Sequence, residues 1–287
     1  MADTLGWIGV GSMGHRMSRH LVAAGHTLVV ADAASTAQAP PQARIASSNA
    51  EVAGLADTII LSLPDGSVSE AVARELAVAA PRRVKTVIDT STIGIKAAEA
   101  VNSILAKVGV EFIDAPVSGG TAGADKATLA IMMACPSATF ERCKPLLALM
   151  GKPFHVGPKP GQGQAVKLLN NFLSATALAA TCEAIAFGTQ QGIEMKTILD
   201  IVNASSGRNS ATDDKFPRRI MHGKYDAGFA AKLQLKDIRL YLENARAAGI
   251  ADEVASSVVG VWEKMNADLP AADITEMYPY TRNGRRR

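Results

Sequence analysis

Lys167 is the residue whose type and surroundings best suit proton transfer. It is the only charged residue between Lys159 and Glu183, in a stretch that is otherwise apolar or neutral and that predicts a buried helix. Asn171 and Ser174 follow at i+4 and i+7, so one polar stripe would run along that helix. Burial lowers the pKa of a lysine, and an amine tuned toward neutral pH can exchange a proton with a substrate oxygen. The alternative is a lysine that extends to solvent from a helix end.

A glycine motif near the N-terminus predicts a dinucleotide site. GVGSMG (9–14) stands between an apolar run at 5–10 and a helical run, where the motif has structural meaning. Gly9 would permit a tight turn, Gly11 would let the backbone approach a pyrophosphate, and Gly14 would allow close packing of helix on strand. The predicted cofactor-binding residues of this segment are Gly9, Val10, Gly11, Ser12, Met13 and Gly14.

Asp32 follows the second predicted strand, at about the spacing expected of an acid that binds the adenosine ribose. A carboxylate there would accept hydrogen bonds from the ribose hydroxyls and repel a 2′-phosphate. Ala33 comes next, and no arginine appears before Arg44. NAD is therefore favoured over NADP. The alternative for Asp32 is an ordinary turn residue after a strand.

Two further strand ends belong to the same predicted crevice, because ligands bind beyond the carboxyl ends of parallel strands. Leu63 and Pro64 end the apolar run at 58–64, and Thr92 follows the run at 86–91. Each residue alone would be an ordinary connection between strand and loop. Their place in the alternation adds them to the predicted cofactor site.

The segment DAPVSGGTAGA (114–124) is rich in glycine and follows another predicted strand. Ser118, Gly119 and Gly120 would offer a hydroxyl and exposed backbone N–H groups, which can hold a carboxylate without a formal cation. The alternative is a flexible turn without a ligand. Its place beside a nucleotide site favours substrate binding.

The elements that must position these residues change character along the chain. Apolar runs separated by helical segments predict a mostly parallel sheet with helices on both faces; the runs are 5–10, 27–31, 58–64, 86–91, 110–116, 129–134 and 152–157. Past Gly163 helical patterns dominate, and PKPGQG (158–163) has the composition of a linker. We therefore predict an α/β Rossmann-type N-terminal domain at 1–162 and an all-α domain for substrate binding and oligomerisation at 163–287.

Composition narrows the function classes. The chain has 287 residues, 48% of them hydrophobic, and a net charge of +3, which is too small to argue for a nucleic-acid partner. Three cysteines without metal-ligand spacing suggest a reducing compartment, and no histidine spacing predicts a metal site. We expect no signal peptide, no transmembrane run free of polar interruption, no membrane partner and a cytoplasmic protein.

The chain resembles the β-hydroxyacid dehydrogenase family, in particular its 3-hydroxyisobutyrate dehydrogenase members. The similarity rests on four motifs in order, spread over nearly the whole length: GVGSMGHRM (9–17), DAPVSGGTAGA (114–124), GQAVKLLNN (163–171) and GFAAKLQLKD (228–237).

The resemblance implies a role for each matched residue. Lys167 would be the catalytic acid/base, and Asn171 would orient the substrate or the lysine. Ser118, Gly119 and Gly120, with Asn171, would bind the substrate. Lys236 would join the predicted dinucleotide site from the second domain. Without the resemblance, Lys236 and Asp237 would be an ordinary solvated helix pair.

Some positions depart from the family pattern or narrow it. Ile95 stands where proline is usual in the loop after Thr92, which bears on the rigidity of that loop. Asn170 replaces the histidine of phosphogluconate dehydrogenases, which disfavours oxidative decarboxylation of a sugar phosphate. Imine reductases usually replace the lysine that this chain keeps as Lys167. Arg208 would lie near the cleft or on an exposed loop.

The resemblance implies an NAD-dependent oxidoreductase that oxidises a small 3-hydroxy acid to its semialdehyde or keto acid. The alternatives are an NADPH-dependent aldehyde or imine reductase of the same fold and a non-catalytic dinucleotide-binding protein. Alanine-rich apolar helices in the second half exceed what so small a domain can bury alone. We therefore expect a homodimer or homotetramer.

Overall fold

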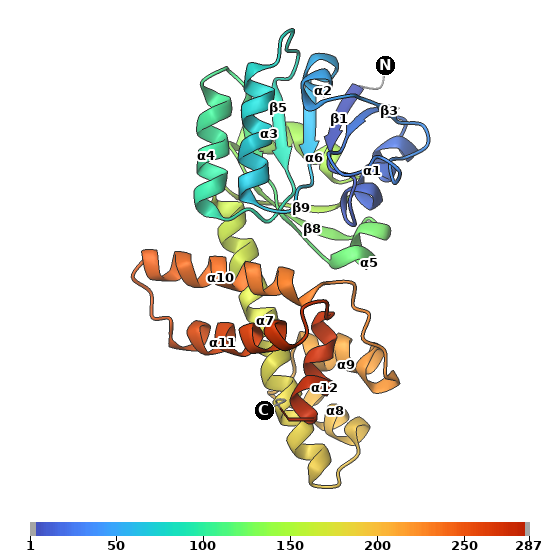
Figure 1. The fold of residues 1–287 in the computed structure, drawn as a ribbon, viewed down its shortest axis with the longest axis vertical. Helices are drawn as coiled ribbons and strands as arrows, with labels where there is room; N and C mark the ends of the chain where they lie inside the picture. The colour runs from blue at the N-terminus through green and yellow to red at the C-terminus, as the bar shows by residue number, and fades with distance from the viewer. Residues whose placement is uncertain (1–3, 285–287) are drawn as a thin grey trace. The chain divides into compact units, whose positions relative to one another are not determined.

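The computed structural model describes residues 4–284, which divide into two compact units between Lys167 and Leu168 (Figure 1). The first unit is a sheet covered by helices, and the second is helical. This is the predicted fold class. The division falls inside a long helix, whereas the composition of the sequence placed the domain boundary at 162/163.

The first unit is built on a nine-stranded sheet in the order β3-β2-β1-β4-β5-β6-β8-β7, with β9 paired to β8. From β3 to β6 all neighbours are parallel. The strands are β1 (Thr4–Ile8), β2 (Thr27–Ala31), β3 (Arg44–Ile45), β4 (Thr58–Leu61), β5 (Thr86–Asp89), β6 (Glu111–Asp114), β7 (Val117–Ser118), β8 (Leu129–Ala134) and β9 (Gly151–Gly157).

The far edge of the sheet departs from the parallel pattern. β8 runs antiparallel to both β6 and β7, and β9 runs parallel to β8. A short connection can return the chain antiparallel, while a parallel neighbour needs a full crossover. The two-residue strands β3 and β7 were not predicted, because they are too short to show a hydrophobic period.

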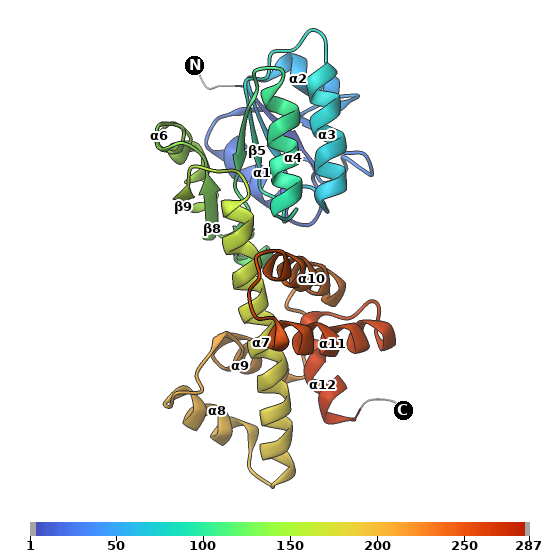
Figure 2. The ribbon, with the colours of Figure 1, turned by 90° about the vertical axis from the view of Figure 1, so that its left-hand side faces the viewer.

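Successive residues of the central strands face opposite sides of the sheet, as the period of a strand requires. Ile59 and Leu61 belong to one buried cluster and Ile60 to another. Helices α3 and α4 lie side by side over one face (Figures 1 and 2). The helices of this unit are α1 (Gly14–Ala23), α2 (Asn49–Leu55), α3 (Gly66–Val78), α4 (Ile95–Ala106), α5 (Gly120–Asp125) and α6 (Ser137–Leu147).

The second unit packs its helices around a core in which Trp262 and Phe216 are fully buried. Its helices are the greater part of α7 (Gln162–Gln190), then α8 (Met195–Asn203), α9 (Phe216–Arg218), α10 (Ala231–Ala247), α11 (Glu253–Asp268) and α12 (Met277–Arg282). A π-helical turn (Ala211–Lys215) and two 3-10 turns (Ile220–His222 and Ile274–Glu276) complete them.

Helix α7 corrects one expectation from the sequence. By length and composition it could cross a membrane, although we expected no such stretch. The core helix of a soluble protein meets the same criteria. Leu178, Cys182 and Ile185 of α7 are buried in the same cluster as Ile238 and Trp262.

The PKPGQG segment (158–163) is tightly packed, although its composition is that of a linker. Gly161 has a φ of +88°, and a Cβ there would lie 2.9 Å from Ile95 Cγ2. A Cβ on Gly163 would lie 2.5 Å from the carbonyl oxygen of Met132. These glycines let the start of α7 approach the sheet of the first unit closely.

Candidate active site

The glycine motif connects β1 to α1 and combines close packing with open space. Gly9 has a φ of +95°, and a Cβ there would lie 2.2 Å from the carbonyl oxygen of Ser62. A Cβ on Gly14 would lie 1.9 Å from the carbonyl oxygen of Gly9. At Gly11 nothing lies within 4 Å of an added Cβ. The exposed backbone at Gly11, just before α1, fits the pyrophosphate of a dinucleotide.

Asp32 follows β2 and fixes the turn around the motif. One carboxylate oxygen accepts the N–H of Val10 at 2.8 Å, and the other accepts the N–H groups of Ala34 and Ser35 at 2.8 and 2.9 Å. Partial burial raises the pKa of Asp32, but the hydrogen bonds from Ser35, Val10 and Ala34 outweigh it and hold that pKa below its usual value. Its contact with a ribose stays a prediction.

The ends of β4 and β5 are joined beside the glycine motif. The N–H of Leu63 donates to Ser91 Oγ at 2.7 Å. Leu63 and Thr92 are partly buried, and Pro64 is exposed. Because β1, β4 and β5 are adjacent and parallel, these predicted cofactor residues meet at one edge of the sheet. Ser91 lies at this edge beside the predicted cofactor residues, and the sequence analysis did not single it out.

The predicted substrate segment is a strand followed by a helix, where the sequence suggested a single loop. Ser118 ends β7 and pairs with Ala130 of β8. Gly119 and Gly120 are exposed, with φ values of +134° and +62°, and start α5. Nothing lies within 4 Å of a Cβ added to Gly120. Accessible backbone N–H groups of this kind suit a carboxylate ligand.

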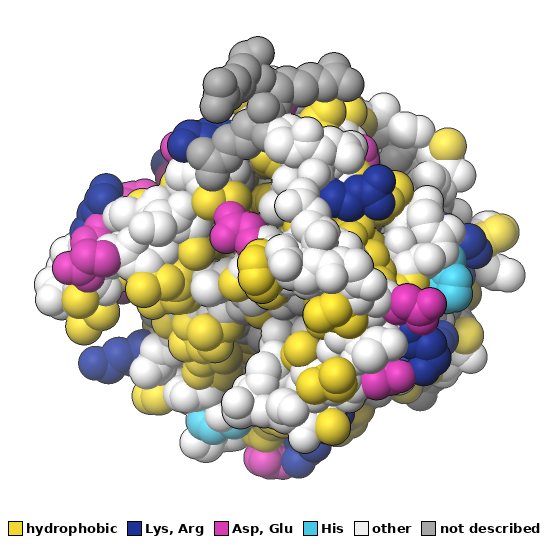
Figure 3. All heavy atoms as spheres, turned by 90° about the horizontal axis from the view of Figure 1, so that it is seen from below, with side chains coloured by type: hydrophobic (Ala, Val, Ile, Leu, Met, Phe, Trp, Pro, Cys, Tyr) yellow, Lys and Arg dark blue, Asp and Glu magenta, His cyan; other side chains and the backbone are white. Residues whose placement is uncertain are grey.

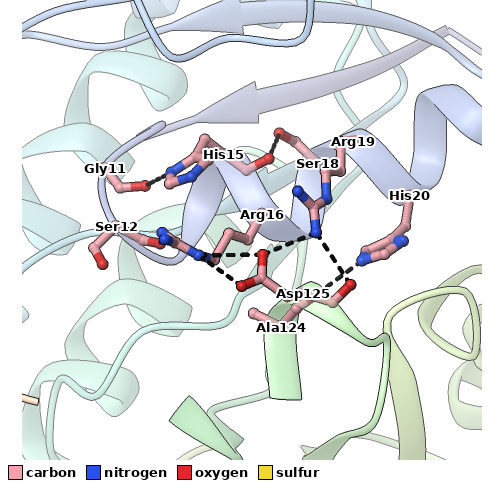
Figure 4. A network of polar contacts seen from close by, with 9 residues as sticks. All are labelled: Gly11, Ser12, His15, Arg16, Ser18, Arg19, His20, Ala124 and Asp125. Carbon is pink, nitrogen blue, oxygen red and sulfur yellow. Dashed lines mark hydrogen bonds and ion pairs between the residues drawn. The ribbon is translucent and has the colours of Figure 1, made fainter. Parts of the chain in front are cut away.

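A polar network holds the predicted substrate segment against the helix of the glycine motif (Figure 4). Asp125, at the end of α5, lies 2.8 Å from Arg19 Nη2 and 3.2 Å from Arg16 Nε, both on α1. Arg16 also donates to the carbonyl oxygen of Ser12 at 2.6 Å. The network therefore links the end of α5 to the backbone of the predicted pyrophosphate site.

Lys167 and Asn171 lie four residues apart on α7, on one face of that helix. Both are buried, with 8% and 7% of their surface exposed. Lys167 therefore does not extend into solvent. An amine held in a largely apolar helix is suited to proton exchange with a bound substrate.

Asn171 is oriented by α10. Its Nδ2 donates to Asp237 Oδ2 at 2.6 Å, and Gln234 Nε2 donates to its backbone carbonyl oxygen at 3.1 Å. Lys236 Nζ lies 3.2 Å from Asp237 Oδ1. Asp237 is only 2% exposed, so the view of Lys236 and Asp237 as a solvated pair was wrong. The contact of Lys236 with a cofactor stays a prediction.

Three further buried polar residues escaped the sequence analysis. Asp89 and Asp114 end the neighbouring strands β5 and β6 and are directly opposite in register. Gln164 lies in the first turn of α7 and is fully buried. Burial raises the pKa of Asp89, and burial together with the charge of Asp89 raises the pKa of Asp114 to about 6, against the hydrogen bonds from Gln164 and Gly161. The signal available in the sequence was an aspartate closing each apolar run, TVID and EFID.

Arg208, a further charged candidate, is exposed and pairs with Asp213 at 2.8 Å. Among residues 4–284 no group of three or more His, Cys, Asp and Glu side chains is placed to hold a metal ion.

Family models match both halves of the chain. Residues 4–158 match the NAD-binding domain of 6-phosphogluconate dehydrogenase. Residues 161–281 match the NAD-binding domain of NADP-dependent 3-hydroxyisobutyrate dehydrogenase.

Whole-chain relatives agree with these matches. The chain is 34% identical to a 2-(hydroxymethyl)glutarate dehydrogenase of Eubacterium barkeri, over 91% of this chain and 95% of the relative. It is 33% identical to an NAD-dependent L-serine dehydrogenase of Pseudomonas aeruginosa, over 90% of each. The solved structure of Mycobacterium tuberculosis 3-hydroxyisobutyrate dehydrogenase with L-serine superposes with a TM-score of 0.89 at 30% identity, over 98% of this chain and all of the other.

Proposed function

The chain belongs to the family of NAD(P)-dependent 3-hydroxyacid dehydrogenases that includes 3-hydroxyisobutyrate dehydrogenase, and on that premise we propose that it oxidises a small 3-hydroxy acid to the semialdehyde or keto acid with NAD. The observation that carries the proposal is the burial of Lys167 on α7, one helical turn from Asn171.

The chain's own residues divide the work of this reaction. The backbone N–H groups of the Ser118–Gly120 segment hold the substrate carboxylate. Neutral Lys167 accepts the hydroxyl proton on Nζ as the C–H bond breaks and the carbonyl forms. Asn171, fixed by Asp237, hydrogen-bonds the substrate or the lysine. Bound NAD supplies the hydride acceptor. In the reverse direction protonated Lys167 donates to the carbonyl oxygen.

The proposal names NAD because of the surroundings of Asp32. Its carboxylate occupies the turn after β2, where a 2′-phosphate would meet a negative charge. Arg44, the first arginine after Asp32, pairs with Glu51 at 2.8 Å. Because Glu51 already engages this arginine, Arg44 is a weaker partner for a 2′-phosphate.

NADH formation by the purified protein tests the proposal. The panel contains 3-hydroxyisobutyrate, L-serine, 2-(hydroxymethyl)glutarate, glycerate and 3-hydroxypropionate, each with NAD and with NADP. We expect turnover of at least one acid, with NAD preferred, and a loss of about 10²–10⁴-fold in Lys167→Ala, the usual contribution of a general acid/base. Near-normal turnover by Lys167→Ala would refute the role of the lysine. Silence across the panel, with NAD still bound, would favour a reductase or a binding protein.

A further inference from the structure

Asp114 caps the start of α7 from a different part of the chain. Its Oδ2 accepts the N–H groups of Gly161 and Gln164 at 2.9 and 3.2 Å, and its Oδ1 accepts Gln164 Nε2 at 2.7 Å. The first N–H groups of a helix need external acceptors. In most helices the acceptor is a side chain just before the first turn. In α7 the acceptor is the fully buried carboxylate of Asp114, at the end of β6.

Gln164 extends the same contact to the end of β5. Its Oε1 accepts the N–H groups of Ile93 and Gly94 at 2.9 and 3.1 Å. Its Nε2 donates to the carbonyl oxygen of Ser91 at 3.1 Å as well as to Asp114. Because both the oxygen and the nitrogen of the Gln164 side-chain amide have hydrogen-bond partners, the side chain has one favourable orientation.

The backbone around Gln164 leaves little freedom. A Cβ on Gly163 would lie 3.0 Å from Asp114 Oδ2, and a Cβ on Gly161 would lie 2.9 Å from Ile95 Cγ2. Lys167 follows Gln164 by three residues, so the two lie on neighbouring positions of the helix surface. A shift or rotation of this turn would therefore move the lysine amine with it.

We propose that Asp114 and Gln164 are positioning residues, which hold the first turn of α7 on the ends of β5 and β6 and thereby set the place of the Lys167 amine. This inference rests on the proposed acid/base role of Lys167. Catalytic groups must be held close to their productive geometry by supporting contacts, and a displacement of about 1 Å can reduce a rate about 10²-fold.

The arrangement predicts a dependence on pH. The charged group acting on Asp114 is Asp89 on the adjacent strand, while Gly161, just before α7, and Gln164, in its first turn, are neutral. Burial, with the charge of Asp89, raises the pKa of Asp114 to about 6. Protonation of Asp114 would weaken it as the acceptor of the Gln164 side-chain N–H. The Gln164 amide cannot rotate to compensate without losing its hydrogen bonds from Ile93 and Gly94. The contact should therefore weaken as the pH falls below about 6.

Measuring the reduction direction separates the titration of Asp114 from that of Lys167. Reduction needs protonated Lys167, and low pH favours that form. The probe is methylmalonate semialdehyde with NADH, or the aldehyde of whichever panel acid is turned over. We expect wild-type kcat to fall below about pH 6. In Asp114→Asn an N–H would face the Gln164 amide, so kcat should be about tenfold or more lower than in the wild type. The acid limb, which is the fall of kcat below about pH 6, should be absent from this variant.

Gln164→Ala and its control Gln162→Ala form a matched pair of variants. Both replace a glutamine in the first turn of α7. Gln162 Oε1 accepts the local N–H of Lys159 at 2.8 Å. We expect Gln164→Ala to lower kcat at least tenfold and Gln162→Ala to match the wild type. The effect of Gln164→Ala on the Kd for NAD should be smaller than its effect on kcat, although Gln164 also holds Ile93 and Gly94 beside Thr92. The double variant Asp114→Asn/Gln164→Glu should recover part of the loss of Asp114→Asn, because the new carboxylate accepts from the new amide.

Wild-type kcat and an unchanged acid limb in Asp114→Asn would overturn the inference. If that variant does not fold, equal kcat values for Gln164→Ala and Gln162→Ala would overturn it. These results differ from failure of the proposed function, which would appear as sustained turnover by Lys167→Ala. An inactive Lys167→Ala beside fully active Asp114 and Gln164 variants would leave the function standing and remove only the positioning role.

Discussion

At the scale of single residues, Asp114 combines a structural task with an unfavourable charge. Accepting three N–H groups favours its ionised form, yet burial and the neighbouring Asp89 favour its neutral form. Buried like charges of this kind are typical of functional sites, where stability is given up for geometry. The same conflict makes stability depend on pH.

We predict that Asp114 makes the free energy of unfolding fall as the pH rises from about 4 to about 6. Its pKa is about 6 in the folded chain against a model value of 3.8, so between these values the folded state binds more protons than the unfolded state. The contribution of Asp114 to the free energy of unfolding is fully present below the pKa of the unfolded chain, and it is lost as the pH rises through about 6. The difference of about two units corresponds to about 3 kcal/mol.

Urea unfolding of wild type and Asp114→Asn at several pH values between about 4 and 7 measures this component. The wild type should lose stability relative to the variant as the pH rises. Asp57→Asn is the control, since the pKa of Asp57 is lowered by Arg83 and Lys85 at the surface. Parallel curves for wild type and Asp114→Asn would contradict the prediction.

Asp32 leads to a prediction about cofactor choice. We expect Asp32→Ala to weaken NAD binding about 10-fold to 100-fold, the range for a lost hydrogen bond to a charged group, and to affect NADP less. The ratio of the two Kd values is the measurement. Loss of the Asp32 contact to Val10 alone would weaken both cofactors equally, and an unchanged ratio would remove Asp32 from the ribose site.

At the scale of elements, the Asp125 network couples α1 to α5 (Figure 4). Its members are partly exposed, with 42% of the Asp125 side chain accessible. Each ion pair therefore contributes at most about 1 kcal/mol to the stability of the fold. Its effect should instead be on position, because α5 begins at Gly120 of the predicted carboxylate site.

We predict that Asp125→Ala raises KM for the hydroxy acid about threefold to tenfold while the Kd for NAD changes less than about twofold, since a contact worth about 1 kcal/mol corresponds to that range. Asp57→Ala is a matched control, because Asp57 is similarly exposed and also pairs with two basic residues, Arg83 and Lys85. Equal KM values for the two variants would show that α5 is held by other contacts.

At the scale of the whole molecule, the helical unit exposes large apolar side chains. Leu173, Phe187, Ile201 and Val254 are each at least 60% exposed. Figure 3 shows hydrophobic side chains gathered between charged ones on the face that it presents. Contiguous exposed apolar surface marks association sites, and we propose that these side chains meet a second copy of this chain.

We therefore predict a homodimer or homotetramer at micromolar concentration, measured by size-exclusion chromatography with light scattering. Phe187→Glu should shift the population toward the monomer, because a buried unpaired charge is strongly unfavourable. Val78→Glu, at an 82% exposed position of α3 in the first unit, should leave the mass unchanged. A monomeric wild-type protein would refute the proposal.

The sequence by itself determined the features that depend on neighbouring residues. The ranges of β2 and β8, the packing roles of Gly9 and Gly14 and a helix around Lys167 all follow from local period and backbone sterics. Only the tertiary structure decided the contact of Asp114 with Gln164, the burial of Asp237 against Asn171 and the antiparallel course of β8. These join residues about 20 to 70 positions apart, and no local pattern records which distant strand or helix the folded chain brings alongside.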